Sequence, residues 1–318
     1  MMGLIEQAVE LLNQASTQRA ATRERAPERP IGQLVDRRAD PSPSQVSAET
    51  PAAVAAPMPC RSDLMVCVDI PALRASGLLA PAADQRQLAE QYRTIKRPLL
   101  ARIKGDQSPR FGNVIVVASA LPGEGKTFTT VNLALSLALE RGREVLLVDG
   151  DVAKPHITHL FGLDKEPGLL DLAGSADLSF EASIVRTDHP SLYVLPAGTG
   201  NLQATEILRS ERTSSLLATL ASEQGRIVLI DSPPLLATSE AGVLTSLAGQ
   251  VVLVVKAAHT PQEAVLHAIE TITDDIPVSL VLNQADAEAG HRYAYYGQYG
   301  YGAADGATAR AVSGSDPV

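Results

Sequence analysis

The sequence predicts an α/β fold in which a mainly parallel β-sheet is covered by helices on both faces. From residue 113 onward, short runs of Val, Leu and Ile alternate with longer segments of helical periodicity. These runs are continuously apolar, which is typical of strands buried on both faces of a parallel sheet. Composition agrees, because 45% of residues are hydrophobic but only 3% are aromatic and Trp is absent. Such an aliphatic core favours layered α/β packing over an aromatic-rich β-sandwich.

The predicted elements alternate along the chain. Aliphatic runs predict strands at residues 114–118, 144–148, 192–195, 227–230, 251–255 and 278–282. Periodicity predicts helices at residues 83–104, 126–140, 204–222, 239–247 and 261–273. Pro98 lies within the first of these helices, and we expect it to kink the helix or to end its first half, because proline lacks an amide hydrogen.

Four segments are expected along the chain. Residues 1–20 predict an amphipathic helix, and residues 21–60 predict a disordered Pro/Ala-rich linker, since prolines are dense there and apolar periodicity is lost. Residues 61–285 carry the alternating pattern and form the predicted folded domain. Residues 286–318 are rich in Gly and Tyr and are expected to form a flexible tail.

Charge and composition exclude several classes of protein. A net charge of −9 argues against a general nucleic-acid binder. Cys60 and Cys67 form no CxxC pair, which argues against a disulfide framework or a zinc site. Glu6 and Glu10 interrupt the apolar core that a secretory signal needs. The most apolar stretch, residues 241–258, is interrupted by polar residues and is expected to form a helix, a turn and a strand. These features predict a cytoplasmic protein.

A phosphate-binding loop is the strongest local signal. Residues 119–127 read SALPGEGKT and match the phosphate-loop pattern, with Ala120 in place of its first glycine. The loop joins a buried strand to an apolar helix, as in P-loop nucleoside triphosphatases, so backbone amides and the helix N-terminus would face a triphosphate. We expect Lys126 to reach the β- and γ-phosphates and Thr127 to bind Mg²⁺. The residues of this region predicted to bind nucleotide are Gly123, Glu124, Gly125, Lys126, Thr127 and Phe128.

Three aspartates follow predicted strands. Asp149 and Asp151 end one strand and Asp231 ends another, so the carboxyl ends of a parallel sheet should bring them to one crevice beside the phosphate loop. Hard carboxylate oxygens suit Mg²⁺, and we assign the metal to Asp149, Asp231 and Thr127. Asp149 or Asp151 would accept a proton from an incoming hydroxyl or orient a water, and the spacing does not divide these roles. The predicted catalytic residues are Lys126, Asp149, Asp151 and Asp231.

Asn283 follows the last predicted strand, at the same edge of the sheet. Its amide offers both a donor and an acceptor, which suits the edge of an adenine base. An asparagine that simply forms a turn is the alternative, and spacing does not separate the two.

At these residues the sequence resembles the bacterial tyrosine kinases. The resemblance spans residues 85–301 and rests on three motifs, at 119–127, 146–151 and 229–234, while residues 90–100 are most similar to the exosortase-associated branch linked to exopolysaccharide production. It implies an ATP- and Mg²⁺-dependent autokinase in the cytoplasm. It also implies a membrane-embedded polysaccharide co-polymerase as a separate partner, which would recruit the kinase to the inner face of the membrane.

The C-terminal tail fits that implied activity. Residues 291–301 contain five of the seven tyrosines, separated by Gly and Ala, a spacing that a packed core does not need. An aromatic tail used for stacking or self-association is the alternative. Together with the kinase-type site, this spacing predicts that the tail tyrosines accept phosphate in trans, from the active site of another subunit. The predicted acceptors are Tyr293, Tyr295, Tyr296, Tyr299 and Tyr301.

The resemblance also implies a ring of subunits built through a Glu-x-x-Arg-x-x-Arg helix. Here Glu90 and Arg93 are present, Lys96 replaces the last arginine, and Arg97 lies one residue later, almost above Glu90 on a helix. Lysine lacks the bidentate fork of arginine, which puts the ring geometry in question. A solvated charged face is the alternative.

Two other functions remain open at this point. A positioning or partition ATPase shares the nucleotide motifs, but its signature lysine five residues before Lys126 is Leu121 here, and the tyrosine tail would have no purpose. A non-catalytic ATP-sensing scaffold of a polysaccharide export assembly would use the same residues, and only turnover separates it from a kinase.

Overall fold

The computed structural model describes residues 58–104, 111–200, 203–223 and 225–285. The expected N-terminal helix, most of the expected linker and all five tail tyrosines lie outside these residues.

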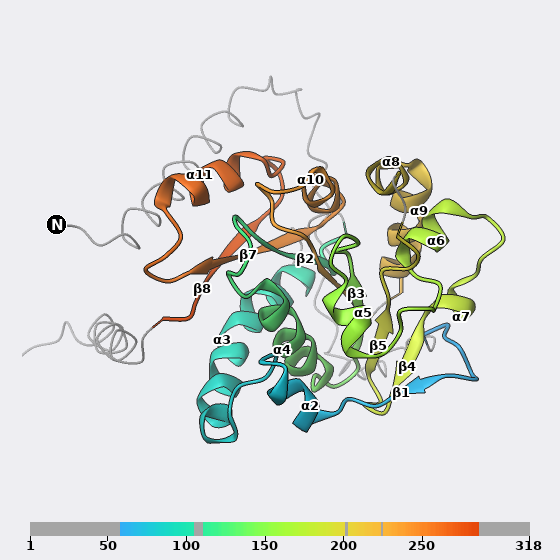
Figure 1. Ribbon diagram of the computed structural model, residues 1–318, viewed down its shortest axis with the longest axis horizontal. Coiled ribbons are helices and arrows are strands. Elements are labelled where there is room, and N and C mark those ends of the chain that lie inside the picture. The colour runs from blue at the N-terminus through green and yellow to red at the C-terminus, as the bar shows by residue number, and fades with distance from the viewer. Residues whose placement is uncertain (1–57, 105–110, 201–202, 224, 286–318) are drawn as a thin grey trace, which may run out of the picture. The chain divides into compact units, whose positions relative to one another are not determined.

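Within the described residues, eight strands form one sheet in the order β1-β4-β5-β3-β6-β2-β7-β8 (Figure 1). Every neighbouring pair is parallel except β4 and β5, which are antiparallel. This arrangement confirms the predicted mainly parallel sheet. The strands are β1 Met65–Val66, β2 Val114–Ser119, β3 Glu144–Asp149, β4 Val185–Thr187, β5 Leu192–Leu195, β6 Arg226–Asp231, β7 Gln250–Lys256 and β8 Val278–Asn283.

Helices cover both faces of this sheet, as predicted. Side chains of α2, α3, α4 and α5 join one apolar cluster, while those of α6, α8, α9, α10 and α11 join the other. The helices are α2 Ile70–Ala75, α3 Gln85–Lys104, α4 Lys126–Ala138, α5 His156–Leu160, α6 Leu169–Gly174, α7 Phe180–Ser183, α8 Ala204–Arg209, α9 Glu211–Ala221, α10 Ser239–Ser246 and α11 Gln262–Glu270, with a 3₁₀ turn at Ala82–Asp84.

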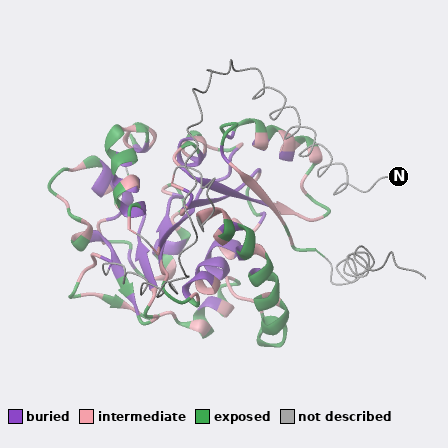
Figure 2. Ribbon diagram, turned by 180° about the vertical axis from the view of Figure 1, so that it is seen from behind, coloured by how far each residue is buried: buried purple, intermediate pink, exposed green. Residues whose placement is uncertain are grey.

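Strand β2, which lies between β6 and β7, explains the continuous aliphatic runs. Val114 and Val116 point into one cluster and Ile115 and Val117 into the other, and all four are fully buried. Successive side chains of a strand point to opposite faces, so a strand with helices on both sides needs apolar residues at every position. Figure 2 shows the buried sheet between the two helical layers.

Two predicted helices differ from the structure. The segment at 204–222 is two helices, because Ser210 has extended backbone angles (φ −65°, ψ 150°) and its hydroxyl caps α9 by accepting from the amide of Thr213. Helix α3 continues through Pro98 instead of ending there. Pro98 and Thr94 are both exposed, so water can satisfy the carbonyl that loses its helical donor.

The expected linker also ends earlier than residue 60. Met58 is buried and belongs to the apolar cluster to which α9 and β5 also contribute, and the amide of Arg61 donates to the carbonyl of Ile184 at 2.9 Å. Residues 58–60 therefore belong to the packed domain, because an apolar methionine side chain fills space in its core.

The stretch at 241–258 forms most of α10, a turn and β7, as expected. Among the helices of the described residues, none combines the length and the apolar character needed to cross a bilayer.

Candidate active site

The phosphate loop lies between the carboxyl end of β2 and the start of α4. Gly123 and Gly125 have φ angles of +79° and +90°, a region that favours glycine, and α4 begins directly at Lys126. Gly125 also meets a close neighbour, because a Cβ added there would lie 2.0 Å from Nδ2 of Asn283. The loop is therefore shaped by two glycines that other residues would distort.

The predicted lysine, threonine and aspartates converge at this loop. Strands β3 and β6 are neighbours, with Asp149 opposite Asp231 in the register. The ammonium of Lys126 lies 3.1 Å from Oδ2 of Asp151, and the hydroxyl of Thr127 donates to Oδ2 of Asp231 at 2.7 Å. Five residues chosen from motif spacing thus form one cluster of charge at the carboxyl edge of the sheet.

Asp231 is held in the interior beside α4. It is almost completely buried, and its Oδ1 lies 3.0 Å from the hydroxyl of Thr130, in addition to its bond with Thr127. Burial raises the pKa of Asp231 to about 7, although the nearby Lys126 and the Thr127 hydroxyl oppose the shift. In the ligand-free protein, the charged form of Asp231 is therefore destabilised by its removal from water.

Asp149 has one satisfied and one unsatisfied oxygen. Its Oδ2 accepts two hydrogen bonds of 2.8 Å, from the backbone amide and from the hydroxyl of Thr158. Its Oδ1 is buried without a hydrogen-bond partner in the described part of the chain. Burial raises the pKa of Asp149 to about 6, with the Thr158 bonds opposing the rise. Motif reasoning missed Thr158, because nothing in its local sequence indicates that a short helix returns it to β3.

The donor set fits a magnesium ion. No cluster of three or more His, Cys, Asp and Glu side chains with metal-site geometry occurs among the described residues. Mg²⁺ does not require one, since it commonly takes one or two carboxylates and keeps several waters. The unpartnered Oδ1 of Asp149 and the Thr127–Asp231 pair supply hard oxygens beside the phosphate loop. Thr127, Asp231 and Asp149 are thus the residues that would hold the ion.

Two other predicted nucleotide residues brace the loop. Glu124 is buried, and its carboxylate accepts from the amide of Leu121 at 2.7 Å and from the hydroxyl of Thr260. Asn283 donates from Nδ2 to the carbonyl of Glu124 at 2.9 Å. Both oxygens of the Glu124 carboxylate are therefore hydrogen-bonded within the protein, and one amide hydrogen of Asn283 is committed to the loop. Adenine recognition by Asn283 stays a prediction, as does nucleotide contact by the half-buried Phe128 on the first turn of α4.

The predicted ring-forming residues divide into two groups. Glu90 and Arg93 are exposed and form a 2.7 Å ion pair on α3, and Arg97 is also exposed. The expectation for Lys96 is wrong, because its buried ammonium lies 2.7 Å from Oε1 of Glu140 and donates to the carbonyl of Ser136. Lys96 ties α3 to α4 and has no surface to offer a second subunit.

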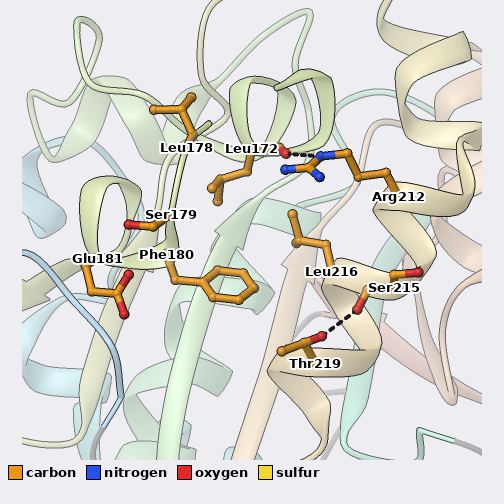
Figure 3. A pocket seen from close by; sticks show the side chains of 9 residues that line it. All are labelled: Leu172, Leu178, Ser179, Phe180, Glu181, Arg212, Ser215, Leu216 and Thr219. Carbon is orange, nitrogen blue, oxygen red and sulfur yellow. Dashed lines mark hydrogen bonds between the residues drawn. The ribbon is translucent and has the colours of Figure 1, made fainter. Parts of the chain in front are cut away.

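A separate surface pocket of about 280 Å³ lies between α6, α7 and α9 (Figure 3). Leu172, Phe180 and Leu216 form its apolar part, and the guanidinium of Arg212 donates to the carbonyl of Leu172 at 2.9 Å. The residues that line it include none of the predicted site residues, so it is distinct from the phosphate site.

Comparison with known proteins agrees with this geometry. The AAA domain family matches residues 112–281. The chain is 31% identical over 211 residues to the tyrosine-protein kinase YwqD of Bacillus subtilis, covering 66% of this chain and 86% of that protein. It is 32% identical over 191 residues to the tyrosine-protein kinase CpsD of Streptococcus pneumoniae, covering 59% of this chain and 82% of that protein.

Other relatives are considerably longer. The chain spans only 32% of the length of EpsB from Ralstonia nicotianae, to which it is 31% identical over 250 residues. Among solved structures, the kinase domain of VpsO is similar with a TM-score of 0.54 and 30% identity, covering 65% of this chain and 100% of that one. The fold, the phosphate site and these similarities together show that the chain belongs to the bacterial tyrosine kinases.

Proposed function

We propose that this protein is an ATP-dependent protein-tyrosine kinase that phosphorylates its own C-terminal tyrosine cluster in trans. The observation that carries the proposal is the cluster of Lys126, Thr127, Asp149, Asp151 and Asp231 around the phosphate loop. Similarity to tyrosine-protein kinases of comparable length supports it.

The proposed reaction is the transfer of the γ-phosphoryl group of ATP to a tyrosine phenol. The phenolic oxygen forms a bond to the γ-phosphorus, the bond from that phosphorus to the β–γ bridging oxygen breaks, and ADP leaves. Lys126 exchanges Asp151 for the phosphates and stabilises the charge that develops on them. A carboxylate of the Asp149–Asp151 pair receives the phenolic proton. When bound, Mg²⁺ neutralises phosphate charge as a Lewis acid.

The described tyrosines support the tail as the acceptor. The chain has seven tyrosines, and both of those in the described residues, Tyr92 and Tyr193, are buried. Because they are buried, their hydroxyls cannot reach the active site of another molecule. The five tyrosines within residues 293–301 are therefore the acceptors that we propose.

The biological setting is also a proposal. Relatives include the succinoglycan biosynthesis transport protein ExoP of Rhizobium meliloti, 30% identical over 233 residues. By that similarity, we propose a role in exopolysaccharide production, with recruitment to the inner face of the membrane by a membrane-embedded polysaccharide co-polymerase. Assembly into a homo-oligomer through the exposed Glu90, Arg93 and Arg97 belongs to the same proposal.

Intact-mass spectrometry after incubation with Mg·ATP tests the activity. We expect successive phosphoryl additions confined to residues 293–301, and none on Lys126→Met. An unmodified parent protein that binds and hydrolyses ATP would contradict the kinase and favour a switch ATPase. An unmodified parent that binds ATP without turnover, even with the cytoplasmic segment of the candidate membrane partner, would favour a sensing scaffold.

A mixing experiment tests transfer in trans. One protein carries Lys126→Met with its tail intact, and the other keeps Lys126 but has all five tail tyrosines changed to phenylalanine. Neither alone should gain phosphotyrosine, whereas the mixture should phosphorylate the Lys126→Met chain. A mixture that stays unmodified while the parent is modified would show transfer within one chain.

A further inference from the structure

Thr158 connects three separate segments at the edge of the active site. It lies on the short helix α5, nine residues after Asp149, and its side chain is almost completely buried. Its hydroxyl donates to Oδ2 of Asp149 at 2.8 Å and accepts from the backbone amide of Ala197 at 3.0 Å. One hydroxyl thus joins β3, α5 and the loop that follows β5.

The backbone of Thr158 adds a second bond to the same carboxylate oxygen. Its amide lies in the first turn of α5, where amides have no helical acceptor, and it donates to Oδ2 of Asp149 at 2.8 Å. Two donors therefore converge on Oδ2. Since Oδ1 is left buried and unpartnered, the carboxylate is oriented with one oxygen bound to the protein and the other available.

The loop after β5 is itself held firmly, so it is a stable support for the hydroxyl. Oδ2 of Asp171 accepts from the amides of Gly168 and Thr199, each at 2.9 Å, and Ala197 between β5 and Thr199 is buried. A carboxylate rotates easily about its last bond, and a hydroxyl anchored at both ends limits that rotation.

We propose that Thr158 is a positioning residue that orients the carboxylate of Asp149 toward the bound Mg·ATP. This inference rests on the proposed function, because it gives Oδ1 of Asp149 a ligand. Thr158 itself does not touch the substrate. Residues in such supporting positions typically change metal affinity or activity by about 10- to 100-fold when they are replaced.

The test uses five variants of the whole chain. Thr158→Val removes the hydroxyl at nearly constant volume, whereas Thr158→Ser keeps the hydroxyl. Thr187→Val is a matched control, since the hydroxyl of Thr187 is also buried and also accepts from one backbone amide, that of His189. It donates to the backbone carbonyls of Leu192 and His189, at 2.8 and 3.1 Å, instead of to a carboxylate of the site. Asp149→Asn, alone and combined with Thr158→Val, completes a double-mutant cycle.

The measured quantity is the affinity for a fluorescent non-hydrolysable ATP analogue, with Mg²⁺ and with EDTA. We expect Thr158→Val to weaken binding in Mg²⁺ about tenfold, with binding in EDTA unchanged. Thr158→Ser should restore the parent value, Thr187→Val should match the parent, and Thr158→Val should have no further effect in the Asp149→Asn protein. If Thr158→Val does not fold, Thr158→Ser tests the proposal. This variant keeps the hydroxyl, so a loss of its Mg²⁺-dependent affinity would overturn the proposal.

Two results would overturn the proposal for folded variants. One is equal affinity for the ATP analogue in Thr158→Val and Thr187→Val. The other is a double variant, Thr158→Val with Asp149→Asn, whose loss of affinity equals the product of the losses of the two single variants. Phosphotyrosine formation by the parent is measured alongside. A parent that makes none while the binding pattern holds would remove the proposed kinase activity and leave the positioning role intact.

Discussion

Replacing Asp231 with asparagine should make the ligand-free protein more stable, and increasingly so as the pH rises. Burial raises the pKa of Asp231 from 3.8 to about 7. The folded state therefore binds this proton more tightly than the unfolded state, and the free energy of unfolding of the parent should fall as the pH rises from about 4 to about 7. Asparagine is neutral at every pH in this range and avoids that loss.

The magnitude follows from the shift of the pKa. Three pKa units correspond to a loss of about 4 kcal/mol for the parent at pH 8, and the loss at pH 6 is about 3 kcal/mol. Against this, asparagine offers one acceptor where Asp231 offers two. Thr130 tolerates the exchange because its hydroxyl also lies 2.8 Å from the carbonyl of Lys126. With about 1–2 kcal/mol for the altered bonds, we expect a net stabilisation of about 2–3 kcal/mol at pH 8.

Urea unfolding at pH 6 and pH 8, in EDTA and without nucleotide, measures this difference. The advantage of Asp231→Asn should be about 1 kcal/mol larger at pH 8 than at pH 6. Asp188→Asn is the control, because hydrogen bonds lower the pKa of Asp188 from its usual value. Its carboxylate is therefore charged in both states at pH 6 and at pH 8, and the effect of its replacement should not change between them. An Asp231→Asn protein that is less stable than the parent at pH 8, or whose advantage does not depend on pH, would refute the reasoning.

Two further substitutions test the loop and the α3–α4 contact. Gly125→Ala should lower the melting temperature and the nucleotide affinity more than Gly123→Ala, because both acquire a strained positive φ but only residue 125 meets Asn283 at 2.0 Å. Thermal unfolding should separate them by about 2–8 °C, and equal losses would argue against the clash. Lys96→Ala should destabilise the protein by about 1–3 kcal/mol in urea unfolding, because it removes a buried cation from its partners. Arg97→Ala should leave stability unchanged and reduce the oligomeric mass in light scattering. If Lys96→Ala instead reduced the oligomeric mass and Arg97→Ala reduced stability, the assignment of Lys96 to the α3–α4 contact and of Arg97 to the interface between subunits would be contradicted.

The sequence located the phosphate site well because its signals are local. Backbone amides and a helix N-terminus form the loop at residues 119–127, so glycine spacing and the lysine–threonine pair are sufficient to recognise it. Asp149 and Asp231 could be placed because strand ends in a parallel sheet meet at one edge. The registers of β3 and β6 then set them opposite one another.

Motif reasoning was weaker for residues whose roles depend on partners distant in the chain. Glu124 was chosen as a nucleotide ligand, but its carboxylate bonds to Thr260, which is 136 residues away. The resemblance to a Glu-x-x-Arg-x-x-Arg helix predicts Lys96 at an interface between subunits. Helical spacing says which residues share a face, but only the position of α4 shows that this face is covered at Lys96.

The sequence by itself determined the alternation of strands and helices, the phosphate loop and the sheet edge at which the acidic residues gather. These features follow from periodicity and backbone geometry within short segments. Only the tertiary structure decided the antiparallel place of β4, the brace formed by Asn283 and the orientation of Asp149 by Thr158. Such contacts depend on how separate elements pack, because packing selects one side-chain orientation from several that the local chain permits equally well.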